Sequence, residues 1–159
     1  MGSQGDGAHT IATNRRARHD YEILETIEAG LVLRGTEVKS LRGSHVTFKD
    51  SFATIRNNEA WLVGCHISPY SHGTDANHEP ERDRKLLLHR REIARLTGKV
   101  AERGLTLIPL RLYFKSGRAK LEIGLARGKK LHDKRSALRE RETRREMEKA
   151  VRASRRGQW

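Results

Sequence analysis

The chain has 159 residues, a length that suits one domain of ordinary size with terminal extensions. Its 33 Lys and Arg against 20 Asp and Glu give a formal net charge of +13, which favours a nucleic-acid partner, with an anionic membrane surface as the rival. The lone Cys65 excludes an internal disulfide and a cysteine cluster for zinc or iron–sulfur binding. No run of about 18 apolar residues exists and no signal-peptide pattern precedes the first element, so we expect a cytoplasmic protein.

Residues 1–13 are rich in Gly, Ser and Thr and have no apolar period, which predicts a flexible leader in which only Ile11 could act as an anchor. From residue 21 onward, apolar residues recur among glutamates. This pattern predicts a long strand over 21–33, with a glycine bulge near Gly30.

A short helix is expected next, with Thr36 as its N-cap and Gly43 as its end. Residues 52–67 alternate around Asn57-Asn58, whose tolerance of positive φ predicts a hairpin of two antiparallel strands. The alternating residues of its second strand are Trp61, Val63, Cys65 and Ile67.

Residues 68–83 carry Pro, Gly and polar side chains, which predicts a surface loop. An apolar helical stripe follows, broken at Gly98 and ended at Gly104, so we expect one broken helix or two short ones. The residues of this stripe are Leu86, Leu87, Ile93, Leu96 and Val100.

Residues 105–126 alternate around Ser116-Gly117, which predicts a second hairpin. About six short strands with helices at the margins favour a small closed barrel, because closure removes exposed strand edges. We therefore predict a mainly β fold, an OB-like closed barrel with flanking short helices, over residues 14–127.

Residues 128–159 form a basic C-terminal tail. Between Lys129 and Arg156 the chain has 12 basic and 5 acidic residues and almost nothing apolar to bury. Isolated ion pairs along a helix stabilise it too little, so we expect the tail to be disordered until an anionic surface makes it helical, with Gly128 as a hinge. A charged tail that is merely solvated is the other reading.

Four segments in this order and spacing closely resemble the SsrA-binding protein family, also called small protein B: "NRRARHDY" (14–21), "EAGLVLRGTEVKSLR" (28–42), "RKLLL" (84–88) and "GKKLHDKR" (128–135). The resemblance implies a bacterial, non-enzymatic protein with an OB-like barrel that binds the tRNA-like domain of transfer-messenger RNA (tmRNA). In trans-translation this family carries the alanine-charged RNA, with elongation factor Tu, to ribosomes stalled on messages without a stop codon. We expect a monomer that needs no cofactor.

The resemblance also implies which residues contact tmRNA: Asn14, Arg16, His19, Glu28, Leu87 and His89, the last at a position where the family usually has Asn. Lys39 and Lys120 are further candidates as phosphate contacts. Because a carboxylate repels phosphate, Glu28 would accept hydrogen bonds from base amino groups or orient an arginine. Without the resemblance, Glu28 reads as an outward polar strand residue and Leu87 as core.

The tail is implied to contact the ribosome in two places. In the decoding centre of the small subunit, ribosomal RNA would meet Gly128, Lys129, Lys130, His132, Asp133, Lys134 and Arg135. In the empty mRNA channel, the tail would become helical and present Arg139, Arg141, Arg144, Arg145, Lys149 and Arg152 to phosphates.

Several alternatives compete with this function. An enzyme is disfavoured because no nucleophile elbow, P-loop or HExxH is present, and Cys65-His66 lies in a strand where adjacent side chains point to opposite faces. His72 and His78 lack a third ligand for a metal. Only the family motifs distinguish the rescue function from that of a general RNA-binding or ribosome-associated protein. Duplex DNA is disfavoured as a partner because the chain has no DNA-binding motif, and a membrane because the basic tail has no apolar face.

Overall fold

The computed structural model describes residues 8–72, 77–129 and 145. The chain divides into two compact units, Met1–Arg127 and Gly128–Trp159, and the fold described below is that of the first. Its elements in order are β1 (Ala8–Thr13), α2 (Ala17–Asp20), β2 (Tyr21–Leu31), α3 (Gly35–Arg42), β3 (Val46–Thr47), β4 (Phe52–Arg56), β5 (Glu59–Val63), β6 (His66–Ile67), β7 (Arg84–Leu87), α4 (Arg90–Arg103), β8 (Thr106–Lys115) and β9 (Arg118–Gly128).

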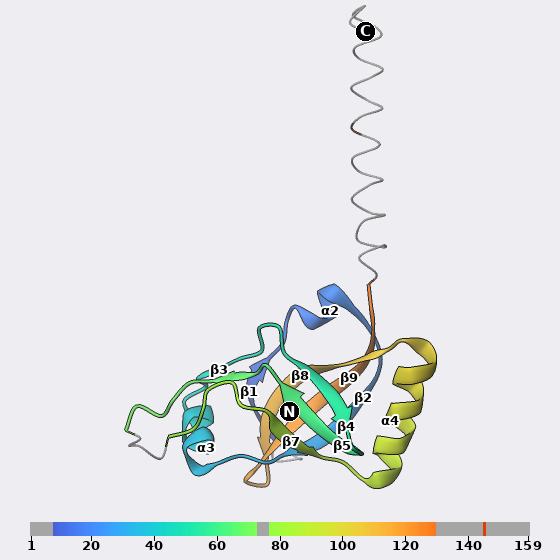
Figure 1. Ribbon diagram of the computed structural model, residues 1–159. Coiled ribbons are helices and arrows are strands. Elements are labelled where there is room, and N and C mark those ends of the chain that lie inside the picture. The colour runs from blue at the N-terminus through green and yellow to red at the C-terminus, as the bar shows by residue number, and fades with distance from the viewer. Residues whose placement is uncertain (1–7, 73–76, 130–144, 146–159) are drawn as a thin grey trace, which may run out of the picture. The chain divides into compact units, whose positions relative to one another are not determined.

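The predicted mainly β fold is confirmed. Strands pair in the order β8-β4-β5-β7-β2-β9, and β9 pairs again with β8, so six strands form a ring (Figure 1). Strand β1 adds to the outer edge of β8, and β3 and β6 form a separate two-stranded sheet. Within the ring lies an apolar core whose fully buried members include Leu62, Leu86, Leu112, Leu121 and Ile123.

Both predicted hairpins are confirmed. The β4–β5 turn has positive φ at Asn57 (52°) and Asn58 (60°), and the β8–β9 turn at Ser116 (52°) and Gly117 (74°). Two consecutive positive φ angles match the right-handed twist of the flanking strands, which is why such turns close tight hairpins.

The alternation predicted for the second strand of the first hairpin holds only in part, because Trp61, Val63, Cys65 and Ile67 do not share one face of one strand. In β5 the inward residues are Ala60 and Leu62, whereas Trp61 is half-buried on the other face. Up to Leu62 the even-numbered residues face inward. Gly64 has a φ of 80°, and after it the odd-numbered Cys65 points into the core. A left-handed residue interrupts the period of two, and periodicity alone cannot locate such a break.

The predicted helical stripe that starts at Leu86 is also wrong. Leu86 and Leu87 belong to strand β7, which pairs with both β5 and β2. Helix α4 starts at Arg90 and runs unbroken through Gly98 to Arg103, and Gly104 ends it with a φ of 61°, as predicted. A short apolar run fits strand and helix equally well, so only its partners in space decide.

Three smaller expectations need correction. Residues 8–13 are not a flexible leader, because they form β1, paired with β8. The N-cap of α3 is Arg34 rather than Thr36. Gly30 pairs directly opposite Leu87 with no bulge in that pairing; a Cβ there would lie 3.2 Å from the Leu87 Cβ, so close approach explains the glycine.

A buried ionic cluster joins α3 to β7. Glu37 and Arg84 are both fully buried, and the Arg84 Nε donates to Glu37 Oε2 at 2.5 Å. The other Arg84 nitrogens donate to the carbonyls of Cys65 and Pro80, and Arg82 donates to both carboxylate oxygens of Glu37. Complete pairing lets the core hold these charges.

Candidate nucleic-acid interface

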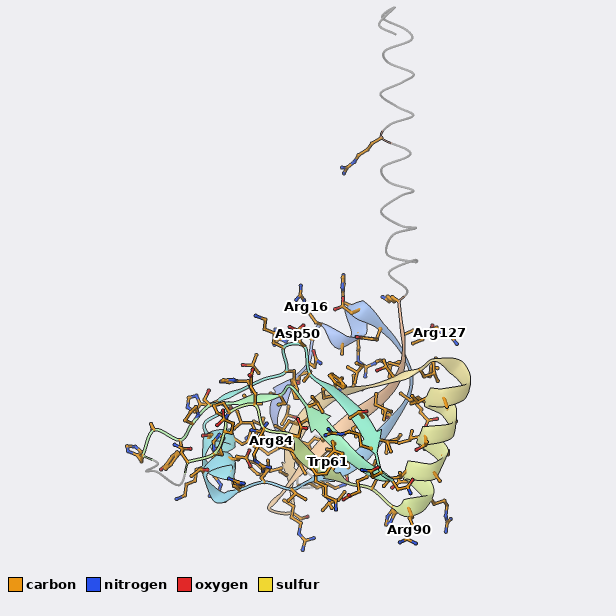
Figure 2. The ribbon with its side chains drawn as sticks, in the orientation of Figure 1. Arg16, Asp50, Trp61, Arg84, Arg90 and Arg127 are labelled. Atoms are coloured by element: carbon orange, nitrogen blue, oxygen red, sulfur yellow. The ribbon has the colours of Figure 1, made fainter. Side chains whose placement is uncertain are left out.

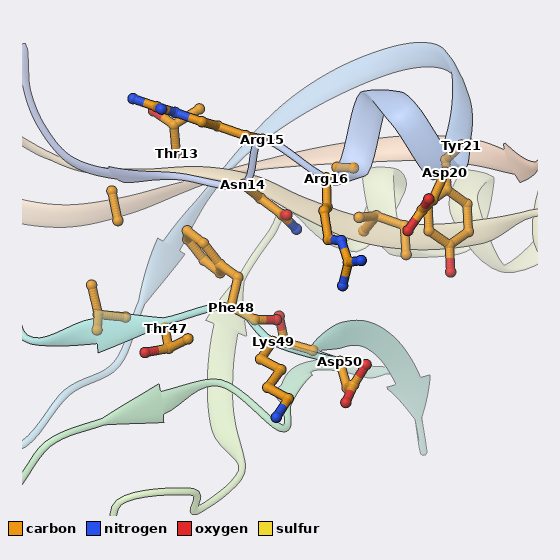
Figure 3. Close-up of a pocket in the computed structure, with 15 residues that line it drawn as sticks. Thr13, Asn14, Arg15, Arg16, Asp20, Tyr21, Thr47, Phe48, Lys49 and Asp50 are labelled. Carbon is orange, nitrogen blue, oxygen red and sulfur yellow. The ribbon is translucent and has the colours of Figure 1, made fainter.

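A surface pocket of about 470 Å³ lies between the β1–α2 segment and residues 46–51. Two of the predicted RNA-binding residues, Asn14 and Arg16, line it together with Lys49 and Asp50 (Figure 3). The Arg16 side chain points toward the loop that carries Lys49 and Asp50, whereas Arg15 points away. Residues from two separate parts of the sequence thus form one hollow, which both basic and acidic side chains line.

Asn14 fixes this segment on strand β8. Its backbone N–H donates to the Leu110 carbonyl and its side-chain Nδ2 to the Pro109 carbonyl, both at 2.8 Å. The one-turn helix α2 packs its buried Ala17 against Ile108 and Leu110. His19 lies on the exposed side of α2, with its Nδ1 3.0 Å from Asp20 Oδ1. The main role of Asn14 that the structure displays is therefore to position Arg16.

Glu28 is the centre of a second polar group. The Tyr113 hydroxyl donates to Glu28 Oε2, and the Lys115 Nζ lies 3.4 Å from the same oxygen. The hydrogen bond from Tyr113 and the charges of Lys115 and Lys120 hold the pKa of Glu28 below its ordinary value, against the opposing effect of partial burial. Burial and the Glu28 carboxylate raise the pKa of the Tyr113 hydroxyl. Glu28 is therefore held as an oriented anion.

Strand β8 supplies partners that the sequence analysis missed. Arg111, Tyr113 and Lys115 occupy alternate positions on β8, and the Arg111 guanidinium lies 4.2 Å from the Tyr113 ring centroid. Arg111 also donates to the Thr10 hydroxyl of β1 at 3.0 Å. The sequence did contain a signal for this group: Arg111, Tyr113 and Lys115 alternate with the apolar residues of the predicted strand, and alternate positions share one face of a strand.

Leu87 and His89 lie at the end of β7 and the start of α4. Leu87 is 55% exposed, so it is not core, and it lies across from Gly30, two residues after Glu28 on β2. His89 is the N-cap of α4, where its backbone N–H donates to Glu92 Oε1 at 3.0 Å. An exposed leucine can stack on an unpaired base, the role that the family resemblance implies.

The two lysines predicted as phosphate contacts have different surroundings. Lys120 pairs directly opposite Tyr113 in the β8–β9 hairpin and so belongs to the group around Glu28. Lys39 is exposed on α3, where its Nζ lies 5.3 Å from the Tyr70 ring centroid. No contact links Lys39 to Glu28 among the described residues. Figure 2 shows that Arg16, a predicted contact, and Arg90, which follows the predicted contact His89, lie well apart.

Most of the predicted ribosome-binding residues lie outside the described residues. Gly128 ends β9, and Lys129 and Arg145 are exposed. The predicted residues outside the described ranges are Lys130, His132, Asp133, Lys134, Arg135, Arg139, Arg141, Arg144, Lys149 and Arg152.

Cys65 and His78 have structural surroundings. Cys65 is fully buried, and burial raises the pKa of its thiol to about 11, so it is a poor nucleophile. The buried His78 has its Nε2 2.8 Å from the Ile67 carbonyl and its Nδ1 2.9 Å from the Thr36 hydroxyl. Across residues 8–72 and 77–129, no three His, Cys, Asp or Glu side chains are grouped to hold a metal. No helix in the described part of the chain is long and apolar enough to cross a membrane.

Comparison with known proteins identifies close relatives. A family model described as SmpB protein matches residues 11–153. The chain is 60% identical to the SsrA-binding protein of Thermosynechococcus vestitus over 92% of this chain and 97% of that protein, and 61% identical to that of Desulforudis audaxviator over 90% and 94%. The SsrA-binding protein of Thermobifida fusca is 60% identical over 96% of this chain and 95% of its own length.

One solved structure is similar in sequence and fold. Its chain is 58% identical, matches with a TM-score of 0.63, and covers 75% of this chain and 84% of its own length. That structure is described as "tmRNA-SmpB: a journey to the center of the bacterial ribosome".

Proposed function

The chain belongs to the SmpB family, and on that premise we propose that it binds tmRNA and delivers it to stalled ribosomes for trans-translation. The observation that carries the proposal is the 58% identity to a chain in a structure described by tmRNA, SmpB and the ribosome. The formal net charge of +13 supports a polyanionic partner.

We further propose a division of labour between the two units. The six-stranded ring, taken as an OB-like barrel, binds the tRNA-like domain through the Asn14–Arg16 pocket, the group around Glu28, and Leu87 with His89. The tail enters the decoding centre and the empty mRNA channel, where its charge contacts ribosomal RNA. The protein acts without catalysis, as a monomer, beside elongation factor Tu on the alanine-charged RNA.

Glu28 supports specific rather than purely electrostatic recognition. Both of its described contacts, from Tyr113 and Lys115, use Oε2, so Oε1 can accept from a base amino group. A carboxylate repels the RNA phosphates, but one held in a fixed orientation can accept a hydrogen bond from a donor on a base edge and so select that base.

A competition assay distinguishes this function from general RNA binding. The full-length protein is bound to labelled tmRNA in about 0.15 M salt, where distant phosphate attraction is screened, and challenged with unlabelled elongator tRNA. We expect elongator tRNA to compete at least about tenfold more weakly than unlabelled tmRNA. Equal competition by the two RNAs would favour a general RNA-binding protein.

A further inference from the structure

We propose that Tyr70 positions Lys39 to hold one backbone phosphate of the bound tmRNA. The inference rests on the proposed function, and it makes the surface formed by α3 and residues 68–72 an RNA contact separate from the group around Glu28. Lys39 was already a candidate phosphate contact. The role of Tyr70, as a positioning residue that acts through this lysine, is new.

The Lys39 ammonium has an aromatic partner instead of an acidic one. Its Nζ lies 5.3 Å from the Tyr70 ring centroid, within the reach of about 6 Å for a cation–π interaction. In the part of the chain that the structure describes, no carboxylate lies within ion-pair distance of this Nζ. By contrast, Lys85, Lys99 and Lys115 each lie within ion-pair distance of a glutamate. An aromatic ring holds an ammonium without neutralising it, so Lys39 keeps its full charge for a phosphate.

The acidic residue nearest in sequence does not offset this charge. Glu37 lies two positions before Lys39 on α3, but its side chain is fully buried and its carboxylate pairs with Arg82 and Arg84. The exposed side chains of α3 are those of Lys39 and Arg42. The solvent-facing side of α3 is therefore positive, which suits a polyanion.

Hydrogen bonds hold Tyr70 beside α3 without using its ring. The Ser40 hydroxyl donates to the Ser68 carbonyl at 2.7 Å, which ties residues 68–72 to α3 (Figure 1). Asn77 Oδ1 accepts from the Tyr70 N–H at 3.2 Å, and Asn77 Nδ2 donates to the Tyr70 carbonyl at 2.9 Å. The His72 ring packs against the Tyr70 ring with centroids 5.5 Å apart and planes at 72°. The backbone should therefore keep its place when the Tyr70 side chain is changed.

A purely structural role for Lys39 is the alternative. The residue lies in the last turn of α3, where the helix dipole favours a cation. That role needs neither Tyr70 nor RNA. K39A would then lower the melting temperature without changing RNA binding, a result that would overturn the proposal.

The test measures tmRNA affinity across a salt series with full-length variants. K39A is expected to weaken binding about five- to tenfold at about 0.1 M salt. It should also reduce the steepness of log K against log salt by about 0.7 to 0.9, the value for one lost phosphate contact. K99A is the matched control, because Lys99 Nζ lies 2.9 Å from Glu25 Oε2 and its loss should leave the slope unchanged. K39R should restore most of the affinity, since arginine binds both phosphate and aromatic rings.

Variants of Tyr70 separate positioning from charge. Y70L removes the ring but leaves the charge of Lys39, so it should weaken binding about two- to fivefold without changing the salt slope. Y70F keeps the ring and should bind like the wild type, since the Tyr70 hydroxyl has no hydrogen bond among the described residues. If Tyr70 acts through Lys39, Y70L should have no further effect when K39A is already present.

Three kinds of result would contradict these expectations in different ways. An unchanged salt slope in K39A, or an equal slope change in K99A, would overturn the phosphate contact. Weaker binding by Y70F, or a Y70L effect that persists alongside K39A, would overturn the positioning role of Tyr70. Failure of the wild-type protein to prefer tmRNA over elongator tRNA would instead overturn the proposed function, and the K39A slope on either RNA would still test the phosphate contact.

Discussion

The Tyr113 hydroxyl donates a hydrogen bond to Glu28 Oε2, joining β8 to β2 across the intervening strand β9. The tyrosine is 3% exposed, whereas the Glu28 side chain is 40% exposed. A buried donor thus fixes the direction of a carboxylate that solvent and ligands can reach.

Y113F should weaken tmRNA binding about three- to tenfold, because a freely rotating carboxylate loses orientation toward its base. The same substitution should raise the pKa of Glu28 toward its ordinary value, which NMR titration of the glutamate carboxyl can measure. Stability should fall by only about 0.5 to 1.5 kcal/mol, since water can solvate Glu28 in place of the tyrosine. An unchanged Glu28 titration would show that Tyr113 does not control this carboxylate.

Leu86 and Leu87 are adjacent in β7, but replacement by alanine should affect mainly stability at Leu86 and mainly RNA binding at Leu87. Leu86 is 1% exposed, so L86A should cost about 2 to 5 kcal/mol in the free energy of unfolding. Leu87 is 55% exposed, so L87A should cost less than about 0.5 kcal/mol yet weaken tmRNA binding. Chemical denaturation and RNA titration of the two variants check this pair, and a stability loss in L87A as large as in L86A would contradict the surface assignment.

E37Q should destabilise the fold by about 3 to 5 kcal/mol at pH 7, because it leaves the fully buried Arg84 without its counter-charge. Burial alone would raise the pKa of Glu37, but hydrogen bonds from Arg82, the Arg34 N–H and Arg84 outweigh burial and hold it below its ordinary value of 4.5. A carboxyl with a lowered folded-state pKa stabilises above its unfolded-state pKa. The wild-type protein should therefore lose this contribution as the pH falls below about 4.5, whereas E37Q should lack that part of the pH dependence.

Thermal unfolding of both proteins between pH 7 and pH 3 measures the Glu37 contribution. E59Q is a suitable control, because Glu59 pairs with Lys85 in an exposed ion pair on the surface. Equal melting temperatures for E37Q and E59Q would contradict a stabilising role of the buried cluster.

H89N should stabilise α4 by about 0.5 to 1 kcal/mol, because Asn is a better N-cap than His and the backbone contact with Glu92 is retained. If His89 occupies the base-contacting position usual for Asn in the family, tmRNA affinity should stay equal or improve. Thermal melting and RNA titration of H89N test both parts, and weaker binding despite higher stability would assign the contact specifically to the histidine ring.

Removal of residues 130–159 should abolish tagging of stalled peptides. The affinity for tmRNA should stay within about threefold of that of the full chain, once the general attraction between the basic tail and the RNA phosphates is taken into account. Residues 8–127 carry the apolar core and the candidate tmRNA site, which is why the RNA contact should survive. A reconstituted translation reaction on a message without a stop codon measures tagging. Normal tagging by the shortened chain would contradict the proposed role of the tail.

The sequence predicted those features of the fold that depend on neighbours along the chain. The Asn57-Asn58 and Ser116-Gly117 turns and the Gly104 helix end were correct because each needs a positive φ that local residue types reveal. Leu86 and Leu87 were misassigned because a short apolar run has no period of its own. The alternation predicted from Trp61 to Ile67 failed because Gly64 reverses which residues face inward.

The sequence by itself indicated a polyanionic partner and predicted the mainly β class and the family, because charge, alternation and motif spacing are properties of residue order. Only the tertiary structure decided that Tyr113 orients Glu28, that Arg16 points toward the loop that carries Lys49 and Asp50, and that Leu87 is exposed beside a buried Leu86. These relationships join residues between 1 and 85 positions apart. Strand pairing and packing determine them, and a reading of residues in chain order contains neither.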